Sequence, residues 1–149
     1  MLTLALARRI RDAGVLWEPA PGDRFTIDRE SVAGDVFWIS HLTIDVHVIQ
    51  GQPVLGFNGT TEWALDSVSL DDSLWLPRED QLRELLRGTF RSLRRTVDGE
   101  GTARYEVEIE LGGAPRVFED ESAENAYAEA LLALVSSVAV DLDDVDELV

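Results

Sequence analysis

The stretch SAENAYAEALLALVSSVAV, at residues 122–140, predicts the helix on which the fold depends. Ser122 suits the N-cap position, because its hydroxyl can accept a hydrogen bond from a backbone amide of the first turn. Apolar residues follow at intervals of three and four and give a broad stripe that we expect to lie on a sheet. The stripe consists of Ala126, Tyr127, Ala130, Leu131, Leu134, Val135 and Val138. After Val140 the chain turns acidic, and residues 141–149 are expected to form an acidic C-terminal tail.

The segment before this helix has the pattern of a half-buried strand. Over residues 103–111, apolar and charged side chains alternate, so that one face is expected to be buried and the other solvated. Turn residues at 98–101 and at Gly112-Gly113 predict neighbouring strands at 89–97 and 116–118.

Residues 24–68 also show a period of two, which predicts further strands. Gly51 and the Asn58-Gly59 pair supply the positive backbone angles that hairpin turns require, so strands that follow each other are expected to be antiparallel. Between residues 36 and 48, the side predicted to face the core carries Val36, Trp38, Leu42, Ile44, Val46 and Val48.

Two shorter helices complete the expected fold. Residues 3–13 form an amphipathic pattern that ends at Gly14, and a second helix is expected from Pro77 to Gly88. The patterns together predict a single α+β domain over residues 1–149. In it, a mostly antiparallel meander sheet is packed by an N-terminal, a central and a C-terminal helix.

The composition excludes several classes of chemistry. All thirteen basic residues are arginine, no cysteine is present, and 29 acidic residues give a net charge of −16. Without lysine there is no P-loop lysine or Schiff base, and without cysteine there is no thiolate nucleophile or thiolate-bound metal. The chain also lacks a G-x-S-x-G motif and a glycine-rich phosphate fingerprint. We therefore expect no cofactor.

The same charge predicts which partners the protein avoids. An acidic surface is repelled by nucleic-acid phosphates and by anionic lipid, so neither nucleic acid nor a membrane is an expected partner. No apolar run approaches the roughly 20 residues of a membrane span. The first fifteen residues place their arginines after the apolar residues, the reverse of a signal peptide, which predicts a cytoplasmic location.

The two histidines give the best candidate metal site. His41, Asp45 and His47 fall on one face of a predicted strand, and nitrogen and carboxylate ligands would suit zinc or another first-row divalent ion. The alternative is that this face is the solvated side of a half-buried strand. The alternative is preferred, because a metal site usually takes ligands from several elements.

A segment rich in arginine gives the candidate partner site. Between residues 78 and 95, six arginines stand against three acidic residues, a local charge of +3 that leaves −19 on the rest of the chain. Guanidinium groups pair bidentately with carboxylates, so an acidic partner, or the acidic tail of the same or another copy, could bind here. The alternative is a set of solvated helix and strand faces. The candidate residues are Arg83, Arg87, Arg91, Arg94 and Arg95.

Aromatic residues near predicted turns give a candidate ligand site. Trp17, Trp63 and Trp75 could surround a small molecule at a sheet edge. Tryptophans in such places more often cap the margin of the core.

Three stretches of the chain resemble a known family. They are WEPAPGDRF at residues 17–25, GFNGTTEWALDSV at 56–68 and LWLPREDQL at 74–82. They look like a family of short actinobacterial proteins that are often labelled pilus assembly protein CpaE. The resemblance runs from about residue 8 to residue 135. It implies a bacterial origin and a compact α+β domain, and it brings no catalytic residues.

These observations favour a non-enzymatic, acidic, cytoplasmic interaction or adaptor protein. Two alternatives stay open. One is a metal-binding protein or metal-dependent hydrolase at His41, Asp45 and His47, and the other is a small-molecule-binding domain.

Overall fold

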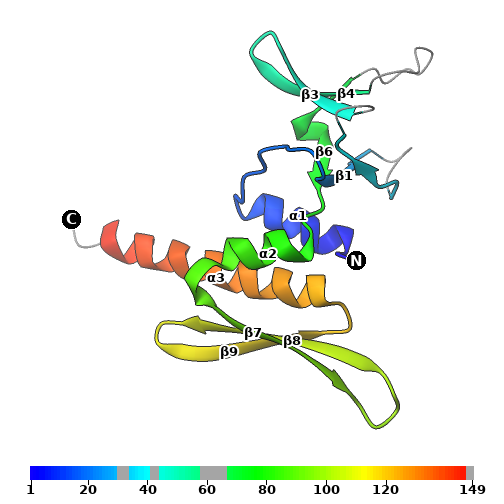
Figure 1. Ribbon diagram of the computed structural model, residues 1–149. Coiled ribbons are helices and arrows are strands. Elements are labelled where there is room, and N and C mark those ends of the chain that lie inside the picture. Colours follow the sequence, from blue (N-terminus) through cyan, green and yellow to red (C-terminus); the bar gives the residue numbers. More distant parts are fainter. Residues whose placement is uncertain (30–33, 41–43, 58–66, 147–149) are drawn as a thin grey trace. The chain divides into compact units, whose positions relative to one another are not determined.

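The structure is a computed structural model that describes residues 1–29, 34–40, 44–57 and 67–146 (Figure 1). Its contacts divide the chain into two compact units. Unit 1 consists of Met1–Val15 and Arg78–Val149, and unit 2 consists of Leu16–Pro77. Each unit is described by itself.

Unit 1 contains three α-helices and one antiparallel sheet in its described residues. The sheet is a meander of order β7-β8-β9. The elements are α1 (Leu4–Asp12), α2 (Glu79–Leu86), the 3-10 turn η2 (Arg87–Thr89), β7 (Phe90–Val97), β8 (Ala103–Leu111), β9 (Ala114–Asp120) and α3 (Ala123–Asp146).

The helices of unit 1 begin where their sequences provide caps. The Thr3 hydroxyl accepts a hydrogen bond from the Leu6 amide at 3.3 Å, and the Ser122 hydroxyl accepts one from the Asn125 amide at 3.4 Å. At α2 the Gln81 side chain reaches back to the Arg78 amide at 3.0 Å. These contacts satisfy amides that have no partner inside a helix.

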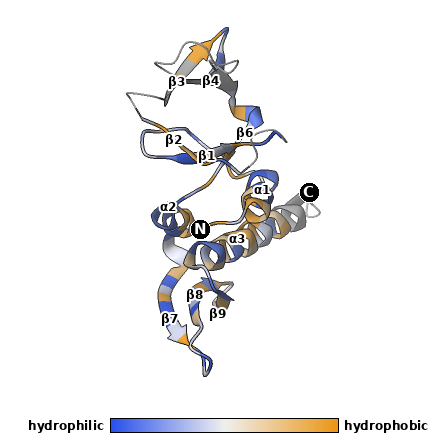
Figure 2. Ribbon diagram, turned by 90° about the vertical axis from the view of Figure 1, so that its right-hand side faces the viewer, coloured by the Kyte–Doolittle hydropathy of each residue, from blue (hydrophilic) through white to orange (hydrophobic). Residues whose placement is uncertain are grey.

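The helix α3 lies between the sheet and the other two helices (Figure 2). It contacts β8 and β9 on one side and α1 and α2 on the other. Val107 and Ile109 of β8 are fully buried, and so is Tyr127 of α3. The alternating pattern at 103–111 therefore places its apolar face in the core, as predicted.

Unit 2 contains two small antiparallel sheets, of order β2-β1-β6 and β3-β4-β5. A core cluster of Phe25, Ile27, Ile39 and Leu55 is buried here. The elements are β1 (Arg24–Ile27), β2 (Phe37–Trp38), β3 (Ile44–Ile49), β4 (Gln52–Phe57), β5 (Ser67–Ser69), the 3-10 turn η1 (Leu70–Asp72) and β6 (Ser73–Trp75). The β3–β4 hairpin turns through Gln50 and Gly51, both of which have positive φ, as a two-residue hairpin turn of this kind requires.

The predicted α+β class, with antiparallel strands and N-terminal, central and C-terminal helices, is confirmed. Within the described residues the strands lie in three sheets, and two of these, β3-β4-β5 and β7-β8-β9, are meanders. The same part of the chain contains no helix that is long and apolar enough to cross a membrane.

Two local predictions were wrong. Trp38 and Val48 were expected on the core side, but their side chains are 52% and 72% exposed. Ile39, the residue after β2, is buried in place of Trp38. In β3 the partly buried Val46 packs against the core, and the hairpin beyond it is exposed. The last helix was expected to end at Val140, but α3 continues to Asp146, so most of the predicted acidic tail is helical.

Candidate functional site

Only part of the predicted metal site lies within the described residues. His41 lies outside the described residues. Asp45 and His47 belong to β3, where they pair in register with Gly56 and Val54, but their side chains are not described either. Among the described residues, no group of three histidine or acidic side chains is placed to hold a metal ion. The site at His41, Asp45 and His47 stays a prediction.

Two of the three candidate tryptophans pack on each other. The rings of Trp17 and Trp75 stack with centroids 6.3 Å apart and an interplanar angle of 3°, and Trp17 also contacts Phe25 at 5.9 Å. Trp63 lies outside the described residues. Trp17 packs against the buried cluster of unit 2, so the stacked pair lies at the margin of this core.

A buried carboxylate fixes this aromatic pair. Asp23 is almost fully buried, and its Oδ2 accepts hydrogen bonds from the Trp17 indole nitrogen and the Ala20 amide, both at 3.0 Å. The backbone oxygen of Asp23 accepts from the Ile39 amide at 2.9 Å. Because a buried charge is costly unless it is hydrogen-bonded, these contacts explain why an acidic residue is tolerated here.

The arginine segment is spread over two faces of unit 1. Arg91 and Arg94 lie on β7 and pair with Glu110 and Glu106 of the neighbouring strand β8. The Arg91 Nη2 to Glu110 Oε2 distance is 2.7 Å, and the Arg94 Nε to Glu106 Oε2 distance is 2.8 Å. Arg95 pairs in register with Tyr105, which places it on the opposite face.

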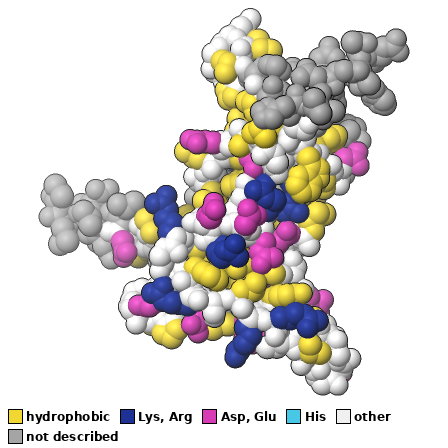
Figure 3. Space-filling view, in the orientation of Figure 1, with side chains coloured by type: hydrophobic (Ala, Val, Ile, Leu, Met, Phe, Trp, Pro, Cys, Tyr) yellow, Lys and Arg dark blue, Asp and Glu magenta, His cyan; other side chains and the backbone are white. Residues whose placement is uncertain are grey.

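The sheet face that carries Arg94 and Glu106 points away from α3, and we call it the outer face. A further pair on it joins Arg104 of β8 to Glu119 of β9 at 3.2 Å. These exposed pairs contribute about 0 to 1 kcal/mol each. On the side seen in Figure 3, basic and acidic side chains intermingle over unit 1. The arginines of the outer face thus already have acidic neighbours.

Arg83 and Arg87 lie at α2. Arg87 follows the last residue of that helix and has a φ of 51°, in the left-handed region. Burial raises the pKa of the Tyr127 hydroxyl, and the neighbouring Arg83 guanidinium lowers it by less, so the net direction is upward. The Tyr127 hydroxyl is buried and has no hydrogen-bond partner among the described residues.

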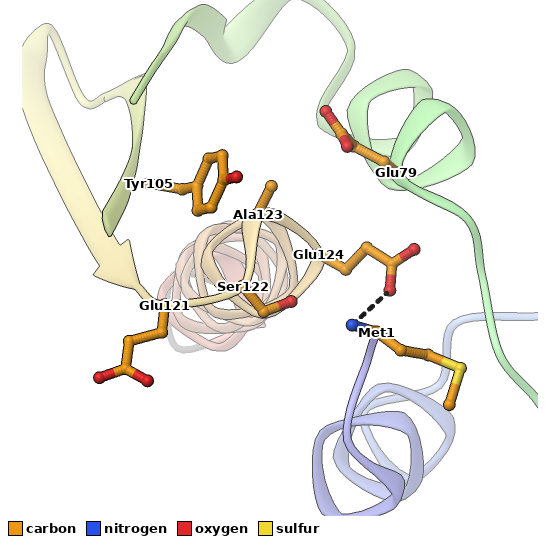
Figure 4. Close-up of a pocket in the computed structure, with 7 residues that line it drawn as sticks. All are labelled: Met1, Glu79, Tyr105, Glu121, Ser122, Ala123 and Glu124. Carbon is orange, nitrogen blue, oxygen red and sulfur yellow. Dashed lines mark ion pairs between the residues drawn. The ribbon is translucent and has the colours of Figure 1, made fainter. Parts of the chain in front are cut away.

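Unit 1 also has a pocket that the sequence did not predict. It has a volume of about 340 Å³ and lies where the chain start, the first turn of α2 and the first turn of α3 meet Tyr105 (Figure 4). Its lining residues are Met1, Glu79, Tyr105, Glu121, Ser122, Ala123 and Glu124. Three of the seven are glutamates, so the pocket is acidic.

The glutamates of this pocket have structural reasons to be there. Glu79 and Glu124 lie in the first turns of α2 and α3, where a carboxylate interacts favourably with the helix dipole. Glu124 Oε2 lies 3.6 Å from the Met1 ammonium and accepts a hydrogen bond from the Leu2 amide. The Glu121 side chain points away from the other two (Figure 4). The pocket is therefore a junction of three segments in which one of the carboxylates is already paired.

The glutamates in the first turns of α2 and α3 can be predicted from the helix starts alone. Their meeting with Tyr105 depends on how α2, α3 and β8 pack, and no local pattern carries that information. The pocket could accommodate a small cationic group, but it presents no nucleophile paired with a base.

Burial changes along α3. Ala126, Tyr127, Ala128 and Ala130 are fully buried, and Leu131 is 2% exposed. Residues 132–135 are half-buried, and residues 138–141 are exposed. We call Ala123–Leu131 the proximal half of α3 and Leu132–Asp146 the distal half. The distal half extends past the end of the sheet in Figure 1.

No protein-family model matches the chain, and no curated protein or solved structure shows significant similarity to it. The resemblance to short actinobacterial proteins stays a prediction.

Proposed function

We propose that this protein is a non-enzymatic interaction protein of the cytoplasm, and that the distal half of α3 is the segment that contacts its partner. One observation carries the proposal. The apolar stripe of α3 continues past the fully buried residues, and on this stripe Val138 is 50% exposed. Exposed apolar side chains that form a continuous stripe mark a binding surface more often than scattered ones do.

The exposed residues continue the stripe that builds the core. Leu131, Leu134 or Val135, and Val138 follow each other at three- and four-residue spacing, so they share one side of the helix. Leu131 is buried in unit 1, whereas Val138 on the same stripe is half exposed. The stripe therefore runs from the core out to the surface without a change in its apolar character.

The arginine segment is a weaker candidate for the contact. An acidic partner at the outer face would have to displace Glu106 from Arg94 and Glu110 from Arg91. Exchanging one carboxylate for another yields little net free energy at an exposed site. We therefore place the contact on α3.

Site-specific cross-linking tests this proposal. A photoreactive amino acid replaces Val138 in one variant and Ser92, which is exposed on the outer face, in a control variant. The adducts formed in the source organism are identified by mass spectrometry, and the partner is purified. We expect Val138→Asp to weaken its binding at least tenfold and Ser92→Asp to leave the affinity unchanged. Equal affinities for both variants would overturn the proposal.

A further inference from the structure

We infer that two copies of this chain pair through β9, edge to edge, so that their sheets join into one continuous antiparallel sheet. Figure 2 shows β8 between β7 and β9, and among the described residues β9 pairs with β8 alone. An edge strand presents unpaired amide and carbonyl groups to any strand that can lie beside it. This edge is a surface separate from the distal half of α3, so the pairing goes beyond the proposed function.

The turn before β9 determines which of its backbone groups face outward. Gly112 and Gly113 form a two-residue turn between Leu111 and Ala114, and both glycines have positive φ. Such a turn is closed by a hydrogen bond between the residues that flank it. Because hydrogen-bonded and non-hydrogen-bonded pairs alternate along antiparallel strands, the backbone groups of every second residue point away from β8. The residues that point outward are Pro115, Val117 and Glu119.

The position of Pro115 agrees with this assignment. Proline has no backbone N–H, and a sheet tolerates it where that N–H would point away from the neighbouring strand. Pro115 also limits the contact, since it can offer only its carbonyl to a second copy. Val117 and Glu119 can offer both backbone groups, and the Val117 side chain is 55% exposed. Pairing is therefore expected around residues 116–120 rather than at the start of the strand.

The charges of β9 favour one register for a symmetric pair. A two-fold axis perpendicular to the sheet places one residue of β9 opposite its own counterpart. With Phe118 at this centre, Arg116 of each copy lies opposite Asp120 of the other, on the same face of the sheet. Val117 and Glu119 then form the hydrogen-bonded pairs on both sides of the axis. The strand is thus complementary to itself in both charge and backbone pairing.

Both groups of this ion pair can still bind a partner. The Arg116 guanidinium lies over the Phe118 ring, 5.5 Å from its centroid, and it makes no ion pair with the described residues. Asp120 Oδ1 accepts hydrogen bonds from the Ser122 amide at 2.8 Å and from Asn125 Nδ2 at 3.2 Å. Asp120 Oδ2 accepts none from the part of the chain that the structure describes. This oxygen can therefore accept from the guanidinium of a second copy.

Other pairings are less favourable. Centring on Arg116 or Glu119 would place two like charges opposite each other. Centring on Val117 would place Pro115 in a hydrogen-bonded pair, where its missing N–H loses a bond. The opposite edge of the sheet is also less suitable. The strand β7 contains three arginines and no acidic residue, so two copies of it would bring positive charges together.

Sedimentation equilibrium of the full chain tests the pairing. At about 150 mM salt, the long-range repulsion between two acidic chains is largely screened, and we expect a concentration-dependent dimer. Arg116→Glu places like charges opposite each other on both sides of the axis and should weaken the dimer at least tenfold. The matched control is Arg95→Glu, the same change of charge at an exposed position of β7, which should alter the dissociation constant less than twofold.

A second pair of variants tests the backbone pairing. Val117→Pro removes an amide that points away from β8, so the monomer should fold and the dimer should be lost. Val117→Thr keeps this amide and should retain the dimer. Circular dichroism of both variants shows whether the fold is intact.

A disulfide reports the register, because the chain has no cysteine of its own. Phe118→Cys places two thiols opposite each other at the two-fold axis, within the separation that a disulfide can bridge. In Val117→Cys the two positions are diagonal neighbours about 7 to 8 Å apart, which is too far for a disulfide. Mild oxidation should therefore link Phe118→Cys into covalent dimers at least tenfold faster than Val117→Cys.

Three results would overturn the inference. The first is a monomer at all concentrations up to about 0.1 mM. The second is a dimer that persists in Arg116→Glu and Val117→Pro, or that Val138→Asp dissociates, since either would place the contact on another surface. The third is a regular series of larger species, which would indicate that β9 binds β7 of another copy in an open arrangement.

Discussion

The two halves of α3 carry one continuous apolar stripe but have very different surroundings. The proximal half lies between the β7-β8-β9 sheet and the helices α1 and α2, and its central residues are almost fully buried. The distal half continues the same stripe beyond these elements, and Val138 is half exposed. The comparison shows that the sequence pattern determines which side of a helix is apolar. The neighbouring elements determine whether that side is buried in the core or remains exposed for a partner to bind.

The strongest test of this contrast is a pair of substitutions by alanine, one in each half of the helix. Leu131→Ala removes an isopropyl group from a buried position and should lower the free energy of unfolding by about 2 to 5 kcal/mol. Val138→Ala should change it by about 0.5 kcal/mol or less, because the side chain is half exposed. All α-helices of the described chain belong to unit 1, so helix ellipticity during urea unfolding reports this difference. Similar losses in both variants would mean that the distal half is also packed.

A smaller effect is expected at the buried hydroxyl of Tyr127. Tyr127→Phe removes a polar group that has no partner among the described residues, so the free energy of unfolding should rise by about 1 kcal/mol at neutral pH. The ring keeps its contact with Phe90, at 5.8 Å between centroids. A loss of stability would show that the hydroxyl has a partner in solution, such as the Arg83 guanidinium or a water molecule.

The pH dependence of the same residue gives a second readout. Burial raises the pKa of Tyr127, so the folded state holds this proton more tightly than the unfolded state does. The resulting stability is fully present below the unfolded pKa of about 10 and is lost as the pH rises through the higher folded value. Urea unfolding at increasing alkaline pH should therefore show a decline that is smaller in Tyr127→Phe. Identical declines in the two proteins would contradict the assignment.

The sequence predicted the proximal half of α3 well and the distal half poorly. Ser122 and the spacing from Ala126 to Leu131 are local signals, and the structure confirms the cap and the buried stripe. The end of the helix was misplaced because the acidic residues after Val140 were interpreted as a break. That segment contains neither glycine nor proline, and aspartate alone weakens a helix without ending it.

Local patterns also did not predict how exposed individual side chains would be. The period of two around Trp38 and Val48 correctly indicates strands, but it does not show how far the core extends along each strand. The meeting of Glu79, Glu124 and Tyr105 in one pocket likewise depends on the packing of elements that are distant in sequence. Such features follow from the tertiary arrangement, which alternation and helical spacing do not specify.

The smallest expected effect concerns the charge at the end of α3. Replacing Asp144 and Asp146 with Arg places positive charge beside the negative end of the helix dipole and should stabilise the last turns by about 0.3 to 1 kcal/mol per residue. The gain should be visible as slower amide exchange in residues 140–146. Unchanged exchange would mean that the dipole has little influence on this end.

The most direct measurement is amide hydrogen exchange along α3. We expect slow exchange in the proximal half and fast exchange in the distal half of the free protein, because protection follows tertiary packing. Equally slow exchange along the whole helix would contradict this difference between the two halves.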